Sequence, residues 1–346
     1  MIGILTTGTG VGSAVAVATA DPFVMIDIGT LGGGYSIATD INDHGVIVGQ
    51  FENAQGEFHA ARWGRDGRIS DLGALGGRSS RANRINAKGM VLGEIITADG
   101  LQQRAVRWDR QGKGMELGTL PGGTNGNPAA IGEDGTVVGY ADTAPDANSA
   151  VFDHAVRWNE LGTITDLGTS GFSSSASDIN KFGIVVGATD DPGYASHAVR
   201  WERNGRTTYL DDLPGGSSSG ASAINDDGTI LGSSTDATGK THAVQWDKRG
   251  RITDLGVFAD SSNNGANLIN DKGLIAGITT MGREFDQYHA TVWTRQGRII
   301  DLGTFPGGTR SETYGINDDG RVVGFADLPN GQLHAVLWLD PRATHR

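Results

Sequence analysis

Six histidines stand at one fixed place in the sequence, four residues before a tryptophan. Histidine is a common general base and metal ligand near neutral pH. A catalytic or metal site needs such a residue once or twice, whereas this one recurs along the chain as His59, His154, His197, His242, His289 and His334. The repetition indicates a structural role, in which a ring nitrogen bonds a neighbouring strand or turn. His44 and His345 alone provide no cluster for zinc or for a Ser-His-Asp arrangement.

Residues that differ from copy to copy of the repeat are the better candidates for chemistry, because binding residues usually lie on loops held by a rigid scaffold. The varying loops and the strand starts that follow them carry charged, amide and aromatic side chains. The binding residues expected there are Tyr35, Arg78, Arg81, Arg84, Asn125, Asn127, Arg310, Glu312 and Tyr314. The alternative interpretation is the ordinary polarity of solvated loops.

If the protein is an enzyme, the same surface predicts a site built from carboxylate, Tyr and Arg side chains rather than from His. The catalytic candidates are Glu312, Arg310, Tyr314, Arg81 and Arg84. A glycosidase needs two carboxylates that flank one bond. Besides Glu312, the corresponding strands supply only Asp40 and Asp178.

Two loops stand out by their length or their aromatic residues. The segment from Ala141 to Asp153 is the longest insertion and holds Phe152. The segment from Met281 to Tyr288 holds two aromatic residues, Phe285 and Tyr288, which complete the set of expected binding residues. Extra length combined with aromatic side chains is typical of contact loops.

These residues are carried by a unit that recurs seven times. The tryptophans are Trp63, Trp108, Trp158, Trp201, Trp246, Trp293 and Trp338, with successive spacings of 45, 50, 43, 45, 47 and 45 residues. An Ile-Asn or Ile-Gly pair and an Asp-Leu-Gly-like run recur with the same period. Self-similarity at a fixed period indicates a repeat architecture.

Each unit reads as four short strands. The first ends in Ile-Asn, the second is the Val-Val-Gly run, the third is His-Ala-Val-Arg-Trp, and the fourth leads to Asp-Leu-Gly, as in Arg298 to Gly303. Gly-containing turns such as Asp226-Asp227-Gly228 separate the strands, and 55 of the 346 residues are Gly. Four strands in about 40–45 residues is the period of a β-propeller blade. We therefore predict an all-β, seven-bladed propeller with four antiparallel strands per blade.

The ends of the chain indicate how the ring closes. The last copy stops after Trp338 without a fourth strand, whereas Phe23 to Gly29 is a fourth strand with no copy before it. We expect this N-terminal strand to complete the last blade, which removes a free sheet edge. The predicted organisation is a signal-peptide remnant or disordered leader over residues 1–20, a single propeller over 21–342 and a tail over 343–346. The uncharged segment from Ile2 to Ala20, which ends in an Ala-x-Ala site, supports the leader.

The other repeated residues are assigned to the scaffold. One Trp per blade predicts packing between blades, and the repeated Asp and Asn predict turn and strand-end hydrogen bonds. The Asp-x-Gly turns lack the further ligands of a calcium loop. The Gly-rich loops, such as Gly32-Gly33-Gly34 and Gly307-Gly308, have neither the helix nor the Lys of a phosphate-binding loop and predict tight crossovers. We expect no cofactor and no metal.

The unit resembles the HAF repeat of bacterial proteins, named after a His-Ala-Phe run. The resemblance rests on units such as Asp301 to Gly308, Ile316 to Gly324 and His334 to Trp338, and it covers nearly the whole chain after residue 22. Val or Ala usually replaces the Phe of the family pattern. The resemblance implies a secreted or envelope location, extracellular or periplasmic. It implies no reaction and no catalytic residues.

The composition limits the classes of partner that the protein is expected to bind. A net charge of −12 argues against nucleic acid, which requires clustered Lys and Arg, and no segment resembles a membrane span. The absence of Cys excludes a disulfide scaffold. We expect a monomeric binding module for a protein, a glycan or a small molecule. The alternatives are a lyase, hydrolase or cyclase with a His-free site, and a purely structural envelope protein.

Overall fold

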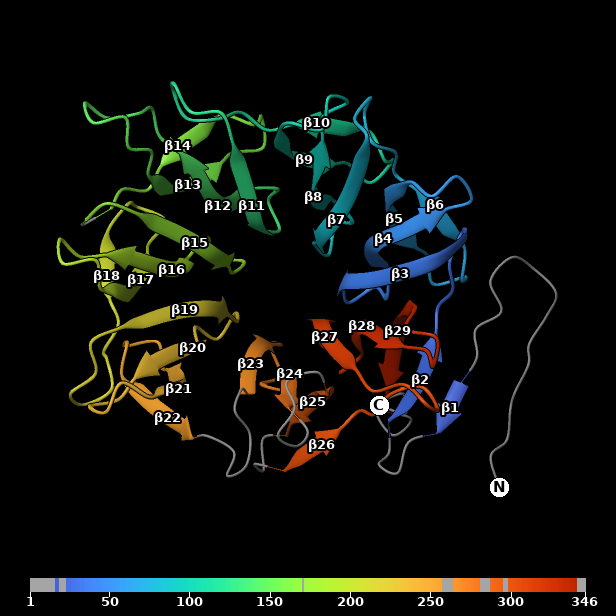
Figure 1. Ribbon diagram of the computed structural model, residues 1–346. Helices are drawn as coiled ribbons and strands as arrows, with labels where there is room; N and C mark the ends of the chain where they lie inside the picture. The colour runs from blue at the N-terminus through green and yellow to red at the C-terminus, as the bar shows by residue number, and fades with distance from the viewer. Residues whose placement is uncertain are drawn as a thin grey trace. The chain divides into compact units, whose positions relative to one another are not determined.

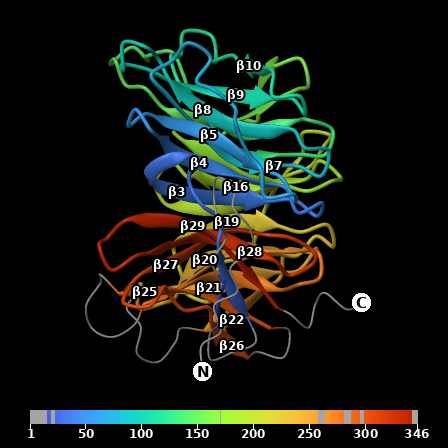
Figure 2. The ribbon, with the colours of Figure 1, turned by 90° about the vertical axis from the view of Figure 1, so that its right-hand side faces the viewer.

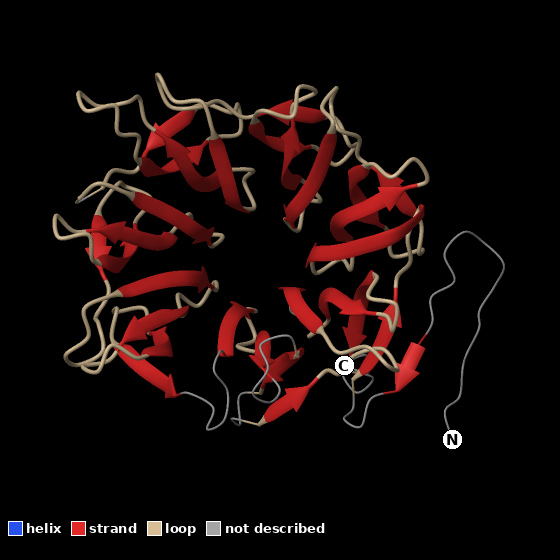
Figure 3. Ribbon diagram, in the orientation of Figure 1, coloured by secondary structure: helices blue, strands red, loops and turns tan. Residues whose placement is uncertain are grey.

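The computed structural model describes Ala16–Ala18 and residues 23–169, 171–256, 264–280, 287–294 and 298–340. All regular secondary structure within these ranges consists of β-strands (Figure 3). Turn-forming Gly residues and β-branched strand residues explain this, because the chain is reversed too often for a helix to form. Among the described residues, no helix is long and apolar enough to cross a membrane.

The first two strands of each blade follow the Ile-Asn and Val-Val-Gly runs. The first strands are β3 (Gly32–Ile41), β7 (Ser79–Ile85), β11 (Gly126–Ile131), β15 (Ser174–Ile179), β19 (Ser219–Ile224), β23 (Asn264–Ile269) and β27 (Ser311–Ile316). The second strands are β4 (Ile47–Asn53), β8 (Val91–Ile96), β12 (Val137–Asp142), β16 (Val185–Asp190), β20 (Ile230–Thr235), β24 (Ile275–Thr280) and β28 (Val322–Asp327).

The third strands contain the repeated Trp, and the fourth strands are short. The third strands are β5 (Phe58–Trp63), β9 (Gln103–Trp108), β13 (Asp153–Trp158), β17 (Ser196–Trp201), β21 (Thr241–Trp246), β25 (Tyr288–Trp293) and β29 (Leu333–Leu339). The fourth strands are β6 (Ile69–Asp71), β10 (Gly114–Glu116), β14 (Ile164–Asp166), β18 (Thr207–Tyr209), β22 (Ile252–Gly256), β26 (Ile299–Asp301) and β2 (Val24–Asp27).

These strands form seven antiparallel sheets, each with the four strands of one blade in order. The fold is therefore the all-β, seven-bladed propeller that the period predicts. The chain divides into two compact units. The first comprises residues 1–74, 78–89 and 258–346, and the second comprises residues 75–77 and 90–257.

The N-terminal strand completes the seventh blade, as its sequence predicts. β2 lies beside β29 (Figure 1) and pairs with it antiparallel, with Met25 opposite Trp338 in the register. The neighbouring first blade is joined to the same strand, because the Ala335 amide donates to Ser36 Oγ at 2.9 Å and β3 runs beside β29 (Figure 2). β1 (Ala16–Ala18) adds a short fifth strand to this sheet, which the prediction of a leader did not anticipate.

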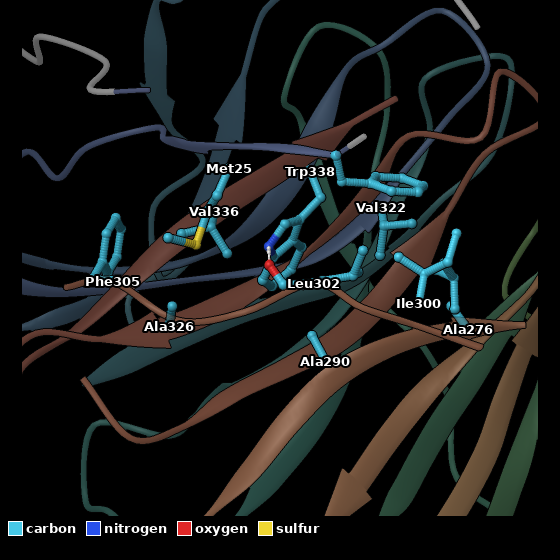
Figure 4. Packing of buried hydrophobic residues seen from close by; sticks show 12 residues of the cluster. Met25, Ala276, Ala290, Ile300, Leu302, Phe305, Val322, Ala326, Val336 and Trp338 are labelled. Carbon is cyan, nitrogen blue, oxygen red and sulfur yellow. Dashed lines mark hydrogen bonds between the residues drawn. The ribbon is translucent and has the colours of Figure 1, made fainter. Parts of the chain in front are cut away.

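The tryptophans pack between blades, as predicted. In the first unit, Trp338 of the seventh blade is buried against Ile300, Leu302 and Phe305 of the sixth (Figure 4). Its Nε1 donates to the Leu302 carbonyl at 3.0 Å. In the second unit, Trp158 packs on the preceding blade in the same way. Burial of a large ring at each contact supplies apolar area that thin four-stranded sheets otherwise lack.

The Gly-rich stretch of the first blade differs from the prediction. Gly32-Gly33-Gly34 belongs to strand β3 and not to a crossover loop, because Gly32 pairs with Asn53 across an irregular register. A side chain on Gly33 would overlap the Glu52 carbonyl, and the Gly34 amide donates to Glu52 Oε2 at 3.1 Å. Close approach of the two backbones therefore requires Gly at this place.

Candidate functional site

The repeated histidines hold the outer strand of each blade. Their Nδ1 atoms lie 2.8–3.3 Å from an Asp carboxylate in the fourth strand of the blade or, after β18, shortly beyond the end of that strand; the pairs are His59–Asp71, His154–Asp166, His197–Asp212, His242–Asp254, His289–Asp301 and His334–Asp27. The last pair joins the two ends of the chain. The prediction of a structural role is thus confirmed, and the repeated Asp proves to be the partner.

The second blade replaces both partners of this contact together. Arg104 stands at the His position and Glu116 at the Asp position, and their side chains form an ion pair at 2.8 Å. The longer Arg and Glu span the same two strands with the same polarity of donor and acceptor. The paired exchange indicates that the interaction, rather than the imidazole, is what each blade requires.

We expect His154→Ala to lower the free energy of unfolding by about 0.5–1 kcal/mol, since it removes one hydrogen bond to a partly exposed carboxylate. The urea unfolding midpoint measures this change. His44→Ala is the matched control, because His44 is exposed in a turn. Equal midpoints for the two variants would contradict the structural role.

Asparagine side chains connect successive blades. Asn317 Nδ2 donates to the Asn42 carbonyl at 3.1 Å, and Asn42 Nδ2 donates to the Asn86 carbonyl at 3.0 Å. Corresponding bonds join Asn180 to Asn225 and Asn270 to Asn317. The predicted strand-end role of the repeated Asn is therefore confirmed.

The two other carboxylates considered for catalysis are engaged by backbone amides. Asp40 accepts from the Ile41 and Ile85 amides at 2.9 and 2.8 Å. Asp178 accepts from the Ile179 and Ile224 amides at 2.8 and 2.9 Å. Each bridges its own blade to the next, so these carboxylates belong to the scaffold. Glu312 is left as the candidate for acid–base chemistry on these strands.

Glu312 and Tyr314 lie two residues apart on β27, where a β-bulge between Thr313 and Gly315 interrupts the pairing with β28. Both are half-buried, and the Tyr314 hydroxyl interacts with the Glu312 carboxyl group closely enough to affect the pKa of each. The Tyr314 ring lies 5.9 Å from the ring of buried Phe325 on the neighbouring strand. Tertiary packing therefore fixes the tyrosine beside the carboxylate.

The surroundings shift the acidity of both groups. Burial raises the pKa of Glu312, although the Tyr314 hydrogen bond opposes the rise. Burial and the negative charge of Glu312 raise the pKa of Tyr314. The pair therefore combines a carboxyl that retains its proton to a higher pH than usual with a phenol that remains a hydrogen-bond donor.

Tyr288 and Arg310 extend this group. They form an isolated parallel β-bridge, and the positive charge of Arg310 lowers the pKa of Tyr288 against the larger effect of burial. Burial raises the pKa of Tyr288, and the charge of Glu312 adds to the effect. Arg310 Nε lies 3.5 Å from Oδ2 of Asp327, which is buried and also accepts from the Thr309 and Arg310 amides.

Arg81 and Tyr35 are the members from the second and first blades. The charge of Arg81 acts on Tyr314 and on Tyr35, lowering the pKa of each against the larger effect of burial. The Tyr35 ring meets Phe58 edge-on at 5.2 Å. We define the Glu312 cluster as Tyr35, Arg81, Tyr288, Arg310, Glu312 and Tyr314, all within the first compact unit.

The other predicted residues have contacts or surroundings of their own. Arg84 donates to the Asn83 carbonyl at 3.0 Å, and Arg78 is exposed. Asn125 and Asn127 lie in the second unit, where Asn125 contacts Asp142 and Asn127 accepts from Gln103. Phe285 falls outside the described residues, together with the loop over 281–286.

Sequence reasoning missed Asp327 and Phe325, which position Arg310 and Tyr314. Asp327 is the last residue of its second strand and corresponds to Asp142 and Asp190 in other blades. Arg310 and Asp327 are 17 residues apart and meet at the open end of the β27–β28 hairpin, so their contact depends on the register of that strand pair.

The described residues contain no group of three or more His, Cys, Asp or Glu side chains arranged to hold a metal ion. The Glu312 cluster instead presents hydrogen-bond donors and one carboxyl group. Such a mixture suits a polar ligand that both accepts and donates hydrogen bonds.

Comparisons with known proteins give likenesses in fold alone. No protein-family model matches the chain, and a search of curated proteins finds no relative. Among solved structures, a streptogramin B lyase is similar with a TM-score of 0.59 at 13% identity, covering 92% of this chain and 97% of the lyase. Virginiamycin B lyase from Staphylococcus aureus has a TM-score of 0.54 at 15% sequence identity, and the match covers 92% of this chain and 99% of the lyase. A puromycin hydrolase has a TM-score of 0.58 at 16% sequence identity, and the match covers 90% of this chain but 52% of the hydrolase.

Proposed function

We propose that this protein is a binding module that recognises a polar ligand, a glycan or a small molecule, through the Glu312 cluster. The observation that carries the proposal is the half-buried Glu312–Tyr314 pair. The repeat does not require these side chains. The corresponding positions of the fourth blade hold Ser175 and Ser177, and those of the fifth hold Gly220 and Ser222.

Burial of a carboxyl group is unfavourable unless it is compensated, so a scaffold built for stability alone would place a small residue here, as the fourth and fifth blades do. Arg81, Arg310 and Tyr288 supply donors around the pair. A ligand hydroxyl or carbonyl group could replace the water that solvates the exposed parts of these side chains.

Catalysis at the same place is the second candidate, supported by the raised pKa of Glu312. A carboxyl whose pKa is moved upward toward neutrality can act as a general acid or base. Propellers of similar fold include proteins described as lyases and a hydrolase, which supports the compatibility of the fold with catalysis.

The location follows from the resemblance to the HAF repeat. We propose that the protein is exported to the cell envelope or the medium, and that residues 1–20 act as a leader. Localisation of a tagged full-length chain in cell fractions, with residues 1–20 present or deleted, tests this.

The binding test is a screen of polysaccharides, oligosaccharides and envelope fractions with the wild type, Glu312→Gln and Arg81→Ala. We expect ligands found with the wild type to bind each variant at least tenfold more weakly. Arg68→Ala is the matched control and should bind like the wild type, because Arg68 is exposed, pairs with Asp66 and is not one of the expected binding residues. Wild-type affinity in both cluster variants would overturn the proposed site.

Product analysis of the same mixtures separates the two candidates. A ligand that the wild type converts, and that Glu312→Gln binds but leaves intact, would establish catalysis. A ligand recovered unchanged after prolonged incubation with the wild type supports binding alone.

The acidity of Glu312 gives a prediction on stability. Its folded pKa is raised, so above that pKa the ionised carboxylate destabilises the folded state, and this cost disappears as the pH falls below the unfolded value. We expect Glu312→Gln to melt at a higher temperature than the wild type at pH 8 and at the same temperature near pH 4. Glu116→Gln, which removes an exposed ion pair, should instead lower the melting temperature slightly at pH 8. A lower melting temperature for Glu312→Gln at pH 8 would contradict the assignment.

A further inference from the structure

A cavity of about 300 Å³ lies in the second compact unit, between the third and fourth blades. Hydroxyl and carboxylate side chains dominate its lining, which consists of Tyr140, Asp153, Ser173, Ser174, Ser175, Ala188, Asp190 and Ser196. The volume suits a small ligand. None of its members belongs to the Glu312 cluster.

Three aromatic rings form a stack beside this cavity. The rings of Phe172 and Tyr194 are parallel, with centroids 4.6 Å apart and planes at 9°. Phe152 follows at 5.4 Å from Phe172. Tyr194 is 70% exposed, so the stack presents ring surface to solvent. We call these three residues the aromatic stack.

The loops that carry the stack also line the cavity. Phe152 directly precedes Asp153 at the end of the longest insertion, and Phe172 directly precedes Ser173. Tyr194 precedes Ser196 by two residues, and its amide bonds the Asp191 carbonyl at 3.0 Å. Tyr194 holds a φ of 66°, which is uncommon for a residue with a side chain. The exposed ring thus sits on a tight turn at the cavity edge.

The charge around the cavity is negative. Asp153 and Asp190 line it, and no Lys or Arg is among the lining residues. The described residues form no ion pair with Asp153, whose pKa is raised by burial and by the negative charge of Asp142. A positively charged ligand would relieve this repulsion, and aromatic faces attract cations.

We propose that this cavity and the aromatic stack bind an organic cation, an ammonium group carried on a flat or aliphatic body. The ammonium group lies near Asp153 and the cavity hydroxyls, and the apolar body rests on the stack. The site is separate from the Glu312 cluster, and the protein would bind the cation whether or not the proposed function at that cluster holds.

The test is calorimetric titration of the full chain with benzyltrimethylammonium, whose charge is permanent, and with benzyl alcohol as its neutral counterpart. We expect the cation to bind at least tenfold more tightly than the alcohol. Asp153→Asn, which retains the size and removes the charge, and Tyr194→Ala, which shortens the stack, should each weaken binding of the cation at least fivefold.

Matched controls keep the result interpretable. Asp99→Asn removes a carboxylate from an exposed turn of the same unit, and Tyr209→Ala removes a ring that is 51% exposed elsewhere in it. Both should bind the cation like the wild type. Equal affinity for cation and alcohol, an undiminished affinity in Asp153→Asn, or preferential binding of uncharged oligosaccharides would overturn the proposal. Circular dichroism verifies that each variant is folded.

Discussion

Deletion of Phe23 to Gly29 is expected to unfold most of the protein at 37 °C. The segment contains β2, which supplies the fourth strand of the last blade and pairs with β29 over four residues. It also carries Phe23 and Met25, both buried in the core that the sixth and seventh blades share. Its Asp27 holds His334 at 2.8 Å.

The size of the effect follows from these losses. Removal of a buried Phe or Met side chain costs about 2–5 kcal/mol each, and the deletion also exposes the edge of β29. A loss of at least about 5 kcal/mol is comparable to the whole stability of a typical domain, about 5–15 kcal/mol. Thermal melting and limited proteolysis measure the change.

A shorter deletion provides the control. Removal of residues 1–20 takes away β1, which pairs only with the outer side of β2 and leaves the β2–β29 ladder intact. We expect that variant to melt within a few degrees of the full chain. An unchanged melting temperature after deletion through Gly29 would show that the ring does not depend on the N-terminal strand.

Trp338→Ala is the second large effect, an expected loss of about 3–5 kcal/mol. The indole fills the space between β29 and the sixth blade, where Leu302 and Val292 are also fully buried. The surrounding strands are fixed by their ladders and can collapse little into the cavity. Chemical denaturation gives the change in the free energy of unfolding.

Substitution by Phe separates the hydrogen bond from the packing. Trp338→Phe removes the bond from Nε1 to the Leu302 carbonyl, whereas Nε1 of Trp63 has no partner among the described residues. We therefore expect Trp338→Phe to be more destabilising than Trp63→Phe by about 1 kcal/mol. Equal losses at the two positions would assign the whole effect to packing.

The fold could be predicted from the sequence because the determining signal is repeated. Seven copies allow the strand order, the turns and the Trp contacts to be predicted by comparing one copy with another. The N-terminal strand that belongs to no complete copy indicates how the last blade is completed. The roles of His and Asn followed from counting alone. Their partners did not, since the spacing of His154 and Asp166 does not show that the two side chains meet.

The candidate site was predictable only in part. Departures from the repeat identified Glu312, Tyr314, Arg310 and Arg81, which the structure brings into one electrostatic group. The Arg84 guanidinium bonds the neighbouring Asn83 carbonyl, a local contact that composition does not reveal. Phe172 and Tyr194 escaped notice for a related reason: each is a single aromatic residue in its own loop, and only folding stacks them.

The central claim is that ligand recognition resides where the repeat fails and that the repeated residues provide stability. The direct test replaces both Glu312 and Tyr314 with Ser, the residue that the fourth blade has at the two corresponding positions. This double variant is compared with His154→Ala for ligand affinity and melting temperature. We expect the double Ser variant to lose ligand binding but to melt within a few degrees of the wild type. His154→Ala should still bind the ligand and should be less stable than the wild type. Wild-type ligand affinity in the double Ser variant would contradict the claim that recognition resides at Glu312 and Tyr314.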